Sequence, residues 1–153
     1  MYNLQPDTEL IDVCADAKFV GCKLTRKSTI AGALMLGGCC IDTWSKTLAC
    51  LALSSAESEL LGAVKGGVEG LCMHSLLGDF GIEAKLCLHM NASAAIGVMQ
   101  RRGVGIIRHL DVSTQWLQER KLQQLMEVRK VHGLANAGDL ITKDVPFEVN
   151  KKQ

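Results

Sequence analysis

The hydrophobic pattern changes its period near residue 54, and this change constrains the fold more than any other feature of the chain. Residues 9–17 are rich in β-compatible and small residues, and residues 28–38 and 39–45 resemble two further strands joined through Gly37 and Gly38, a connection suited to a hairpin. Beyond residue 54, apolar side chains recur at helical spacing, at Leu60, Val64, Val68, Leu71 and Leu76. Three strands followed by a long helix are therefore predicted.

The predicted helix has a recognisable start and an unusual middle. Ser55 is a suitable N-cap, and Glu57 and Glu59 fall in the first turn, where acids are favourable. Three glycines then interrupt it, each weakening a helix by about 1 kcal/mol relative to alanine; they are Gly66, Gly67 and Gly70. Glycine there predicts close packing of the helix against the sheet.

The second half of the chain alternates between strands and helices. Residues 85–90 predict a short buried strand, and residues 91–102 a short helix that opens at Asn91, a good capping residue. A helix over 108–124, an edge-type strand over 126–133 and a terminal helix over 136–145 complete the order βββαβααβα. This order predicts an α/β fold in which helices flank a mixed sheet.

Length and composition bound the protein class. With 153 residues and 48% hydrophobic content, we expect a single domain over 1–153, with a core over about 9–146 and short polar termini. A net charge of +1 argues against coating nucleic acid through bulk positive charge. No apolar run approaches the ~20 residues of a membrane span, so an intracellular protein, cytoplasmic or nuclear, is expected. The short polar N-terminal segment, residues 1–10, equally fits the boundary of a domain taken from a larger polyprotein.

The seven cysteines are predicted to be small buried hydrophobes in a reducing compartment, because they are odd in number and mostly lie inside apolar runs. No C-x-x-C pair occurs, and the four histidines lack zinc-ligand spacing. A structural zinc site is therefore not expected.

Three acids and one amide form an ordered polar set, each on the end of a different predicted element: Asp16, Glu59, Asn91 and Asp139. Carboxylates that converge on a pair of divalent ions can hydrolyse a phosphodiester, one ion activating water and the other stabilising the leaving oxygen. Glu57 lies about 200° from Glu59 around a helix, so only one of the two can face such a site.

The sequence resembles the ribonuclease H domain of copia-type LTR retrotransposons. The matching segments are ADAKFVGCKLTRKSTIAGALMLGG, TWSKTLACLALSSAESELLGA, MNASAAIGV, RHLDVSTQWLQE and ANAGDLITKDV, in order from about residue 13 to residue 146. The resemblance implies a ribonuclease H-like fold, a five-stranded mixed sheet whose first three strands are antiparallel, flanked by helices. It also implies magnesium-dependent endonucleolytic cleavage of the RNA strand of RNA–DNA hybrids, with two Mg²⁺ ions, or Mn²⁺ in their place.

Carried over by motif, the family's metal-binding and catalytic acids fall on Asp16, Glu59 and Asp139, and leave Glu57 as a solvated acid. The fourth acid falls on Asn91. An amide brings no charge and one ligating oxygen, so metal occupancy and reaction rate should both fall, the latter by orders of magnitude. The second acid that family members often carry after the first is replaced by Lys18, a position that is not normally a ligand.

The resemblance also directs attention to positions for substrate contact. Basic side chains suited to phosphates are Arg26, Lys27, Arg101, Arg102, Arg108 and His109, each of which is equally explained as ordinary surface charge. His132 is an auxiliary candidate for product release or proton transfer, or simply an edge-strand residue. The expected partners are an RNA–DNA hybrid and a fused or associated reverse transcriptase, with no membrane and no small-molecule cofactor.

Two alternatives to a hybrid ribonuclease stay open. One is a non-catalytic nucleic-acid or protein interaction domain derived from such an enzyme, and the other is a nuclease or integrase branch of the same superfold that acts on DNA. The origin of Asn91 is equally open: a deliberate Asp→Asn change, a decayed copy, or a natural variant that needs only weak catalysis.

Overall fold

A five-stranded sheet with helices on both faces forms the body of the protein in the computed structural model, which describes residues 9–22, 24–101, 111–133 and 136–142. The strands are β1 (Leu10–Lys18), β2 (Thr29–Leu36), β3 (Cys39–Thr47), β4 (Lys85–Met90) and β5 (Glu127–Lys130). The helices are α1 (Ser55–Asp79), α2 (Ser93–Gln100), α3 (Asp111–Leu122) and α4 (Ala137–Thr142). The predicted element order is therefore confirmed.

The sheet runs in the order β3-β2-β1-β4-β5, with β1, β2 and β3 antiparallel and β4 and β5 parallel to β1. This is the predicted mixed sheet with three antiparallel strands first. Gly37 and Gly38 both adopt positive φ, 55° and 86°, and pair Leu36 with Cys39 across a two-residue hairpin. Such turns match the twist of the flanking strands.

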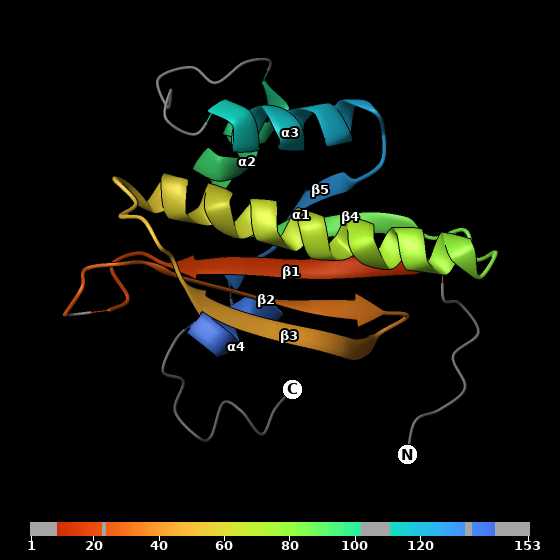
Figure 1. Cartoon of the computed structure of the whole chain (residues 1–153), viewed down its shortest axis with the longest axis horizontal. Helices are drawn as coiled ribbons and strands as arrows, with labels where there is room; N and C mark the ends of the chain where they lie inside the picture. The colour runs from red at the N-terminus through yellow and green to blue at the C-terminus, as the bar shows by residue number, and fades with distance from the viewer. Residues whose placement is uncertain (1–8, 23, 102–110, 134–135, 143–153) are drawn as a thin grey trace.

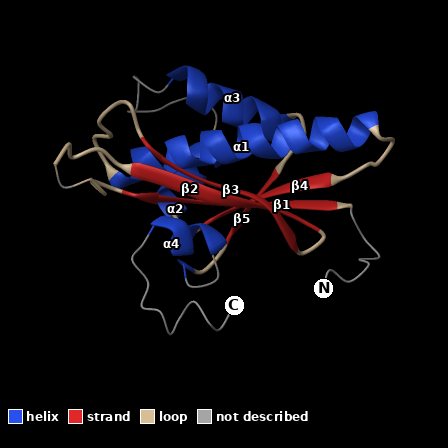
Figure 2. Cartoon of the chain, turned by 60° about the horizontal axis from the view of Figure 1, so that its bottom comes forward, coloured by secondary structure: helices blue, strands red, loops and turns tan. Residues whose placement is uncertain are grey.

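The two faces of β1 divide the molecule into layers. Ile11, Val13 and Ala15 are buried on the face that carries α1, while Asp12, Cys14 and Asp16 alternate onto the opposite face. Figure 2 shows α1 and α3 on one side of the sheet and α4 on the other. The polar residues of β1 therefore face the side that α4 only partly covers.

Two of the three glycines predicted to pack on the sheet, Gly66 and Gly70, lie where α1 approaches it, whereas Gly67 faces Leu117 and Trp116 of α3 and Met126. A Cβ on Gly70 would lie 2.5 Å from Leu86 Cδ1, and a Cβ on Gly66 would lie 3.1 Å from both Leu88 Cδ1 and Val13 Cγ1. A side chain at either position would have to displace the side chains of β1 and β4 that pack against it. The helical stripe itself is less buried than predicted, because Val68 and Leu76 are exposed; the glycine face supplies the contact instead.

The cysteine prediction is wrong for most of the seven. Cys87 alone is fully buried; Cys14, Cys22 and Cys39 are half-buried and the remaining three are exposed. All seven are free thiols. Apolar neighbours in the sequence do not bury a residue on an edge strand or a loop, which is where Cys40 and Cys50 lie. Within the described residues, no helix is long and apolar enough to span a membrane.

Candidate active site

Three members of the predicted polar set meet at one edge of the sheet. The amide Nδ2 of Asn91 donates to Asp16 Oδ1 at 3.1 Å and to Asp139 Oδ1 at 3.5 Å. Asp16 belongs to β1, Asn91 directly follows β4, and Asp139 lies in the first turn of α4. Residues far apart in the sequence thus form one hydrogen-bonded cluster of two carboxylates bridged by an amide.

The parallel pairing of β1 with β4 brings Asn91 to Asp16. Asp12 pairs with Cys87 and Cys14 with His89, so the same register continued by two residues sets Asn91 beside Asp16. The predicted capping role of Asn91 is wrong. The N-cap of α2 is Ala92, without a side-chain cap bond, and Asn91 Nδ2 donates to the two carboxylates instead.

The loop before α4 is fixed by Asn136, a residue that sequence reasoning missed. Asn136 is buried; its Nδ2 donates to the Ala15 carbonyl at 3.0 Å and its Oδ1 accepts from the Gly138 amide at 3.1 Å. The second bond is a helix N-cap. An Asn directly before a predicted helix was the available signal. Through these bonds Asn136 fastens α4, and with it Asp139, to the middle of β1.

Two glycines set how closely the backbone approaches the cluster. A Cβ on Gly138 would lie 2.9 Å from Asp16 Cβ and 3.1 Å from the Asp16 amide nitrogen. A Cβ on Gly133 would lie 3.2 Å from Asp139 Oδ2 and 3.8 Å from Asn91 Nδ2. Glycine at 133 therefore leaves space directly beside the acidic cluster.

The two acids at the start of α1 have different roles. Glu57 is buried; its Oε2 accepts from the Leu53 amide at 2.8 Å while its own amide donates to Ser54 Oγ at 3.2 Å. These reciprocal bonds form a capping box, so the N-cap is Ser54 and not Ser55. The prediction that Glu57 is a solvated acid is wrong, because its carboxylate is buried and accepts a hydrogen bond from the Leu53 amide.

Glu59 lies at the same edge of the sheet as the cluster. A Cβ on Gly62 would lie 3.4 Å from the Asp16 carbonyl oxygen, whereas Gly66 approaches Val13. The first turns of α1 therefore lie over the carboxyl end of β1, and Glu59 precedes Gly62 by about one turn. Its side chain is half-buried, with Oε2 shielded from solvent.

The predicted substrate-contacting residues are described only in part. Arg26 is exposed and Lys27 partly exposed in the loop after β1, and Arg101 is exposed at the end of α2. His132 is exposed just beyond β5 and directly precedes Gly133. Arg102, Arg108 and His109 lie outside the described residues.

Comparison with solved structures shows the class of fold. The structure of LC11-RNase H1, isolated from compost, superimposes with a TM-score of 0.63 over 88% of this chain and 92% of that one, at 11% identity. The same protein in complex with an RNA/DNA hybrid gives 0.58 over 83% and 88%, at 16% identity. An N-terminal ribonuclease H domain from Mycobacterium tuberculosis gives 0.55 over 83% and 85%, at 13% identity. The chain has a ribonuclease H-like fold.

The sequence comparison adds the kind of element. The chain is 28% identical over 142 residues to the retrovirus-related Pol polyprotein from transposon TNT 1-94 of Nicotiana tabacum, covering 90% of this chain and 11% of that polyprotein. No family model matches. The fold and this similarity together support the predicted ribonuclease H domain of an LTR retrotransposon.

Proposed function

We propose that this domain is a magnesium-dependent ribonuclease that cleaves the RNA strand of RNA–DNA hybrids, and that Asn91 weakens it. The observation that carries the proposal is the convergence of Asp16, Asn91 and Asp139 at the sheet edge where α1 brings Glu59. The related fold that was solved with an RNA/DNA hybrid is consistent with this substrate.

The donor set suits hard divalent cations. Carboxylate and amide oxygens are the ligands that Mg²⁺ and Mn²⁺ prefer, and we propose Asp16, Glu59, Asp139 and Asn91 Oδ1 as the ligands of two such ions. The ions would activate a water molecule and stabilise the leaving oxygen. Asp16 is 1% exposed, so its orientation is fixed before any ion binds, which lowers the cost of assembling the site.

Asn91 opposes metal binding in two ways. Its Nδ2 hydrogens already satisfy one oxygen of each neighbouring carboxylate, so a cation must compete with these bonds. Its amide must also turn to present Oδ1, and that oxygen carries no formal charge. The side chains of the cluster are hydrogen-bonded to one another without a cation, which opposes metal binding. Because three acids of the set are intact, we expect weak activity and not a complete loss.

We propose that the protein contacts its substrate through the sugar-phosphate backbone of the hybrid and not through base edges. RNA–DNA hybrids are recognised largely through phosphates and 2′-hydroxyls, with little sequence preference. Arg26 and Lys27 follow the strand that carries Asp16, and Arg101 ends the helix that follows Asn91, and we propose these side chains for phosphate contact. The similarity to a Pol polyprotein favours a fused or associated reverse transcriptase as the partner.

A substrate panel tests the proposed function. Purified Asn91→Asp protein should cleave the RNA strand of an RNA–DNA hybrid with Mg²⁺ and leave duplex DNA and duplex RNA intact. Adding Asp139→Asn to that protein should abolish cleavage. Cleavage of duplex DNA instead would point to the DNA-acting branch. Hybrid binding without cleavage, insensitive to Mg²⁺ and to Asp16→Asn, would establish the non-catalytic interaction domain.

The neighbouring acids of α1 provide a matched pair of variants. In the Asn91→Asp background, Glu59→Ala should lower hybrid cleavage by at least about 100-fold and change the free energy of unfolding little, because Glu59 is assigned to the metal site. Glu57→Ala should do the reverse and destabilise the fold by about 1–2 kcal/mol through loss of the capping box. Cleavage rates and urea unfolding measure both effects. Equal losses of cleavage in the two variants would contradict the assignment.

A further inference from the structure

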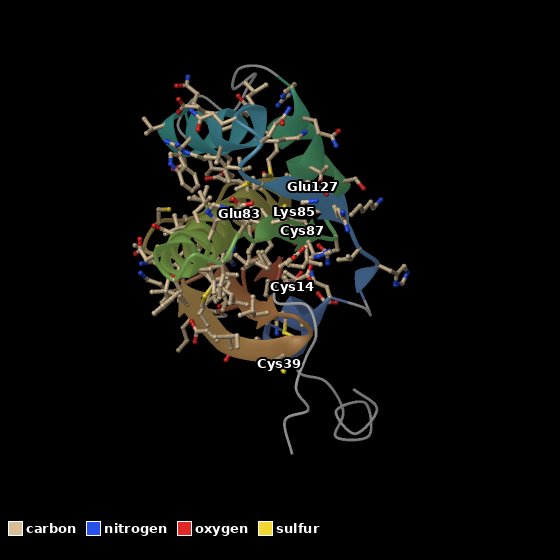
Figure 3. The ribbon with its side chains drawn as sticks, turned by 90° about the vertical axis from the view of Figure 1, so that its right-hand side faces the viewer. Cys14, Cys39, Glu83, Lys85, Cys87 and Glu127 are labelled. Carbon is tan, nitrogen blue, oxygen red and sulfur yellow. The ribbon has the colours of Figure 1, made fainter. Side chains whose placement is uncertain are left out.

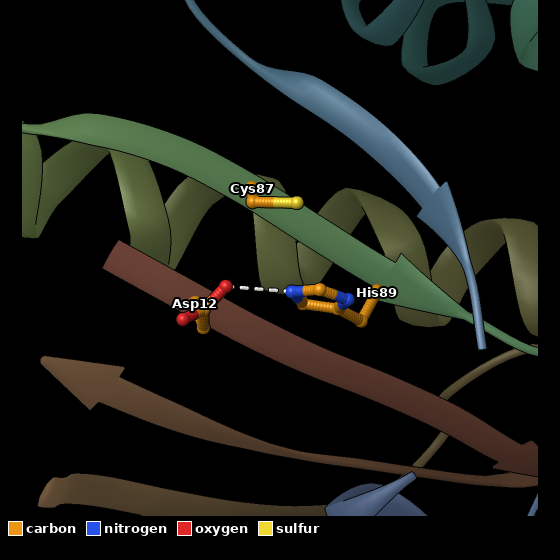
Figure 4. A group of neighbouring side chains, drawn as sticks. All are labelled: Asp12, Cys87 and His89. Carbon is orange, nitrogen blue, oxygen red and sulfur yellow. Dashed lines mark hydrogen bonds and ion pairs between the residues drawn. The ribbon is translucent and has the colours of Figure 1, made fainter. Parts of the chain in front are cut away.

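A second group of ligand-type side chains lies on the sheet face that carries the acidic cluster. Asp12 of β1 and Cys87 and His89 of β4 project from this face, and their ligand atoms all lie within 4.8 Å of one another. His89 Nε2 and Asp12 Oδ1 are 2.6 Å apart. Figure 4 shows the three side chains converging from the two neighbouring strands. In Figure 3, the labels Cys39, Cys14, Cys87 and Glu127 lie on β3, β1, β4 and β5 in turn.

We propose that Asp12, Cys87 and His89 bind one transition-metal ion of the zinc class. A thiolate, an imidazole and a carboxylate are together the donors that Zn²⁺ selects, and sulfur is a donor that Mg²⁺ does not favour. Three protein ligands leave the fourth tetrahedral position for water. Asp12 and His89 side chains are 26% and 16% exposed, so solvent reaches the open position while the Cys87 sulfur stays buried.

The geometry needs little adjustment to accept the ion. Bonds of about 2.0–2.3 Å in a tetrahedral site place neighbouring ligand atoms roughly 3.3–3.7 Å apart. The present separations bracket this range: 2.6 Å between Asp12 and His89, and up to 4.8 Å within the group. The strands are paired here, with Asp12 directly opposite Cys87, so the two side chains are neighbours on one face of the sheet.

Metal binding at Cys87 requires the thiol to lose its proton. Burial raises the pKa of the Cys87 thiol to about 11, so without metal the sulfur is a neutral, unreactive thiol. Binding replaces the thiol proton with the ion and releases that proton to solvent. The His89–Asp12 pair then changes from a hydrogen bond to two ligands of the same ion.

This site is separate from the proposed magnesium site. Asp12 precedes Asp16 by four strand residues, about 13 Å along β1, and the described part of α4 packs on β1 and β2, away from β4. The two sites differ in donor chemistry, sulfur and nitrogen in one and oxygen in the other. A metal bound by Asp12, Cys87 and His89 would tie β1 to β4 upstream of the edge that carries Asp16 and Asn91.

Cobalt titration tests the proposal without any nuclease assay. The exposed thiols can bind metal adventitiously, so the protein to use has serine at Cys22, Cys39, Cys40, Cys50 and Cys72. Reduced, metal-free protein titrated with Co²⁺ should develop a sulfur-to-cobalt charge-transfer band and the visible bands of tetrahedral cobalt, saturating at one equivalent. Zn²⁺ should displace the cobalt, and a large excess of Mg²⁺ should not.

Matched variants decide which residues bind. Cys87→Ser should abolish the charge-transfer band, and His89→Gln should weaken cobalt binding by at least about 10-fold, while Cys14→Ser on the same face should change neither. Circular dichroism of each variant checks that it is folded. A charge-transfer band that survives Cys87→Ser, or the absence of any band in the parent protein, would overturn the proposal. The readout is a sulfur-to-cobalt band, which the all-oxygen acidic cluster cannot produce, so this test is independent of ribonuclease activity.

Discussion

Asn91→Asp protein should cleave the RNA strand of an RNA–DNA hybrid at least about 100-fold faster than the present chain, in Mg²⁺. Even groups that only support a metal's ligands are worth about 10–100-fold in activity, and here the change restores a ligand. It also replaces a hydrogen-bond donor, 3.1 Å from Asp16 Oδ1, with an anionic oxygen. Single-turnover rates with excess enzyme measure the gain directly.

The control for this gain is Asn136→Asp. That change makes the same chemical substitution in the same region, but Asn136 binds the Ala15 carbonyl and the Gly138 amide instead of the carboxylate cluster. It should give no increase in cleavage. A gain in neither variant, with both folded and binding hybrid, would remove Asn91 as the cause of weak activity.

In the absence of divalent metal, Asn91→Asp should destabilise the fold by about 3–6 kcal/mol. The change removes two hydrogen bonds to carboxylates, each worth about 1.5–3 kcal/mol, and sets a third anion beside Asp16, which is 1% exposed. Mg²⁺ should restore much of this loss, because an ion that binds only the native state stabilises it in proportion to the logarithm of its concentration. Urea unfolding with EDTA and with Mg²⁺ provides both values.

Asn91→Ala separates the two contributions to this loss. It removes the bridging amide without adding charge, so it should be destabilised with or without Mg²⁺, and by similar amounts. If Mg²⁺ stabilised the alanine variant as strongly as the aspartate variant, the recovery would come from ion binding that does not involve position 91. If the aspartate variant showed no recovery, Asp16 and Asp139 would not be metal ligands.

The sequence predicted the elements because their signals are local. The strand over residues 85–90 matches β4 residue for residue, since a short apolar run between turn residues suffices to define it. The alternation of side chains along β1 puts Asp12 and Asp16 on one face. Asp16, Asn91 and Asp139 were predicted as a group from the matching motifs of the resembled family, and the hydrogen bonds of Asn91 bring the three side chains together.

What the sequence did not reveal depends on pairing between distant segments. The Asp12–Cys87–His89 group exists only because β1 and β4 pair with Asp12 opposite Cys87, a register that no local pattern encodes. Asn91 looked like a helix cap because its competing partners, two carboxylates, come from other elements. Glu57 was misassigned for a simpler reason: moving the cap by one residue to Ser54 turns a surface acid into half of a capping box.

The attachment of α4 has a consequence for when the site can exist during synthesis. Asp139 joins the cluster through Asn91, and Asn136, close to the end of the described chain, binds α4 to the carbonyl of Ala15 near its start. A ribosome that has not yet extruded the last helix therefore carries a chain whose first four strands can pair while the acidic cluster is still missing a member. Assembly of the acidic cluster is tied in this way to completed synthesis of the last helix of the domain.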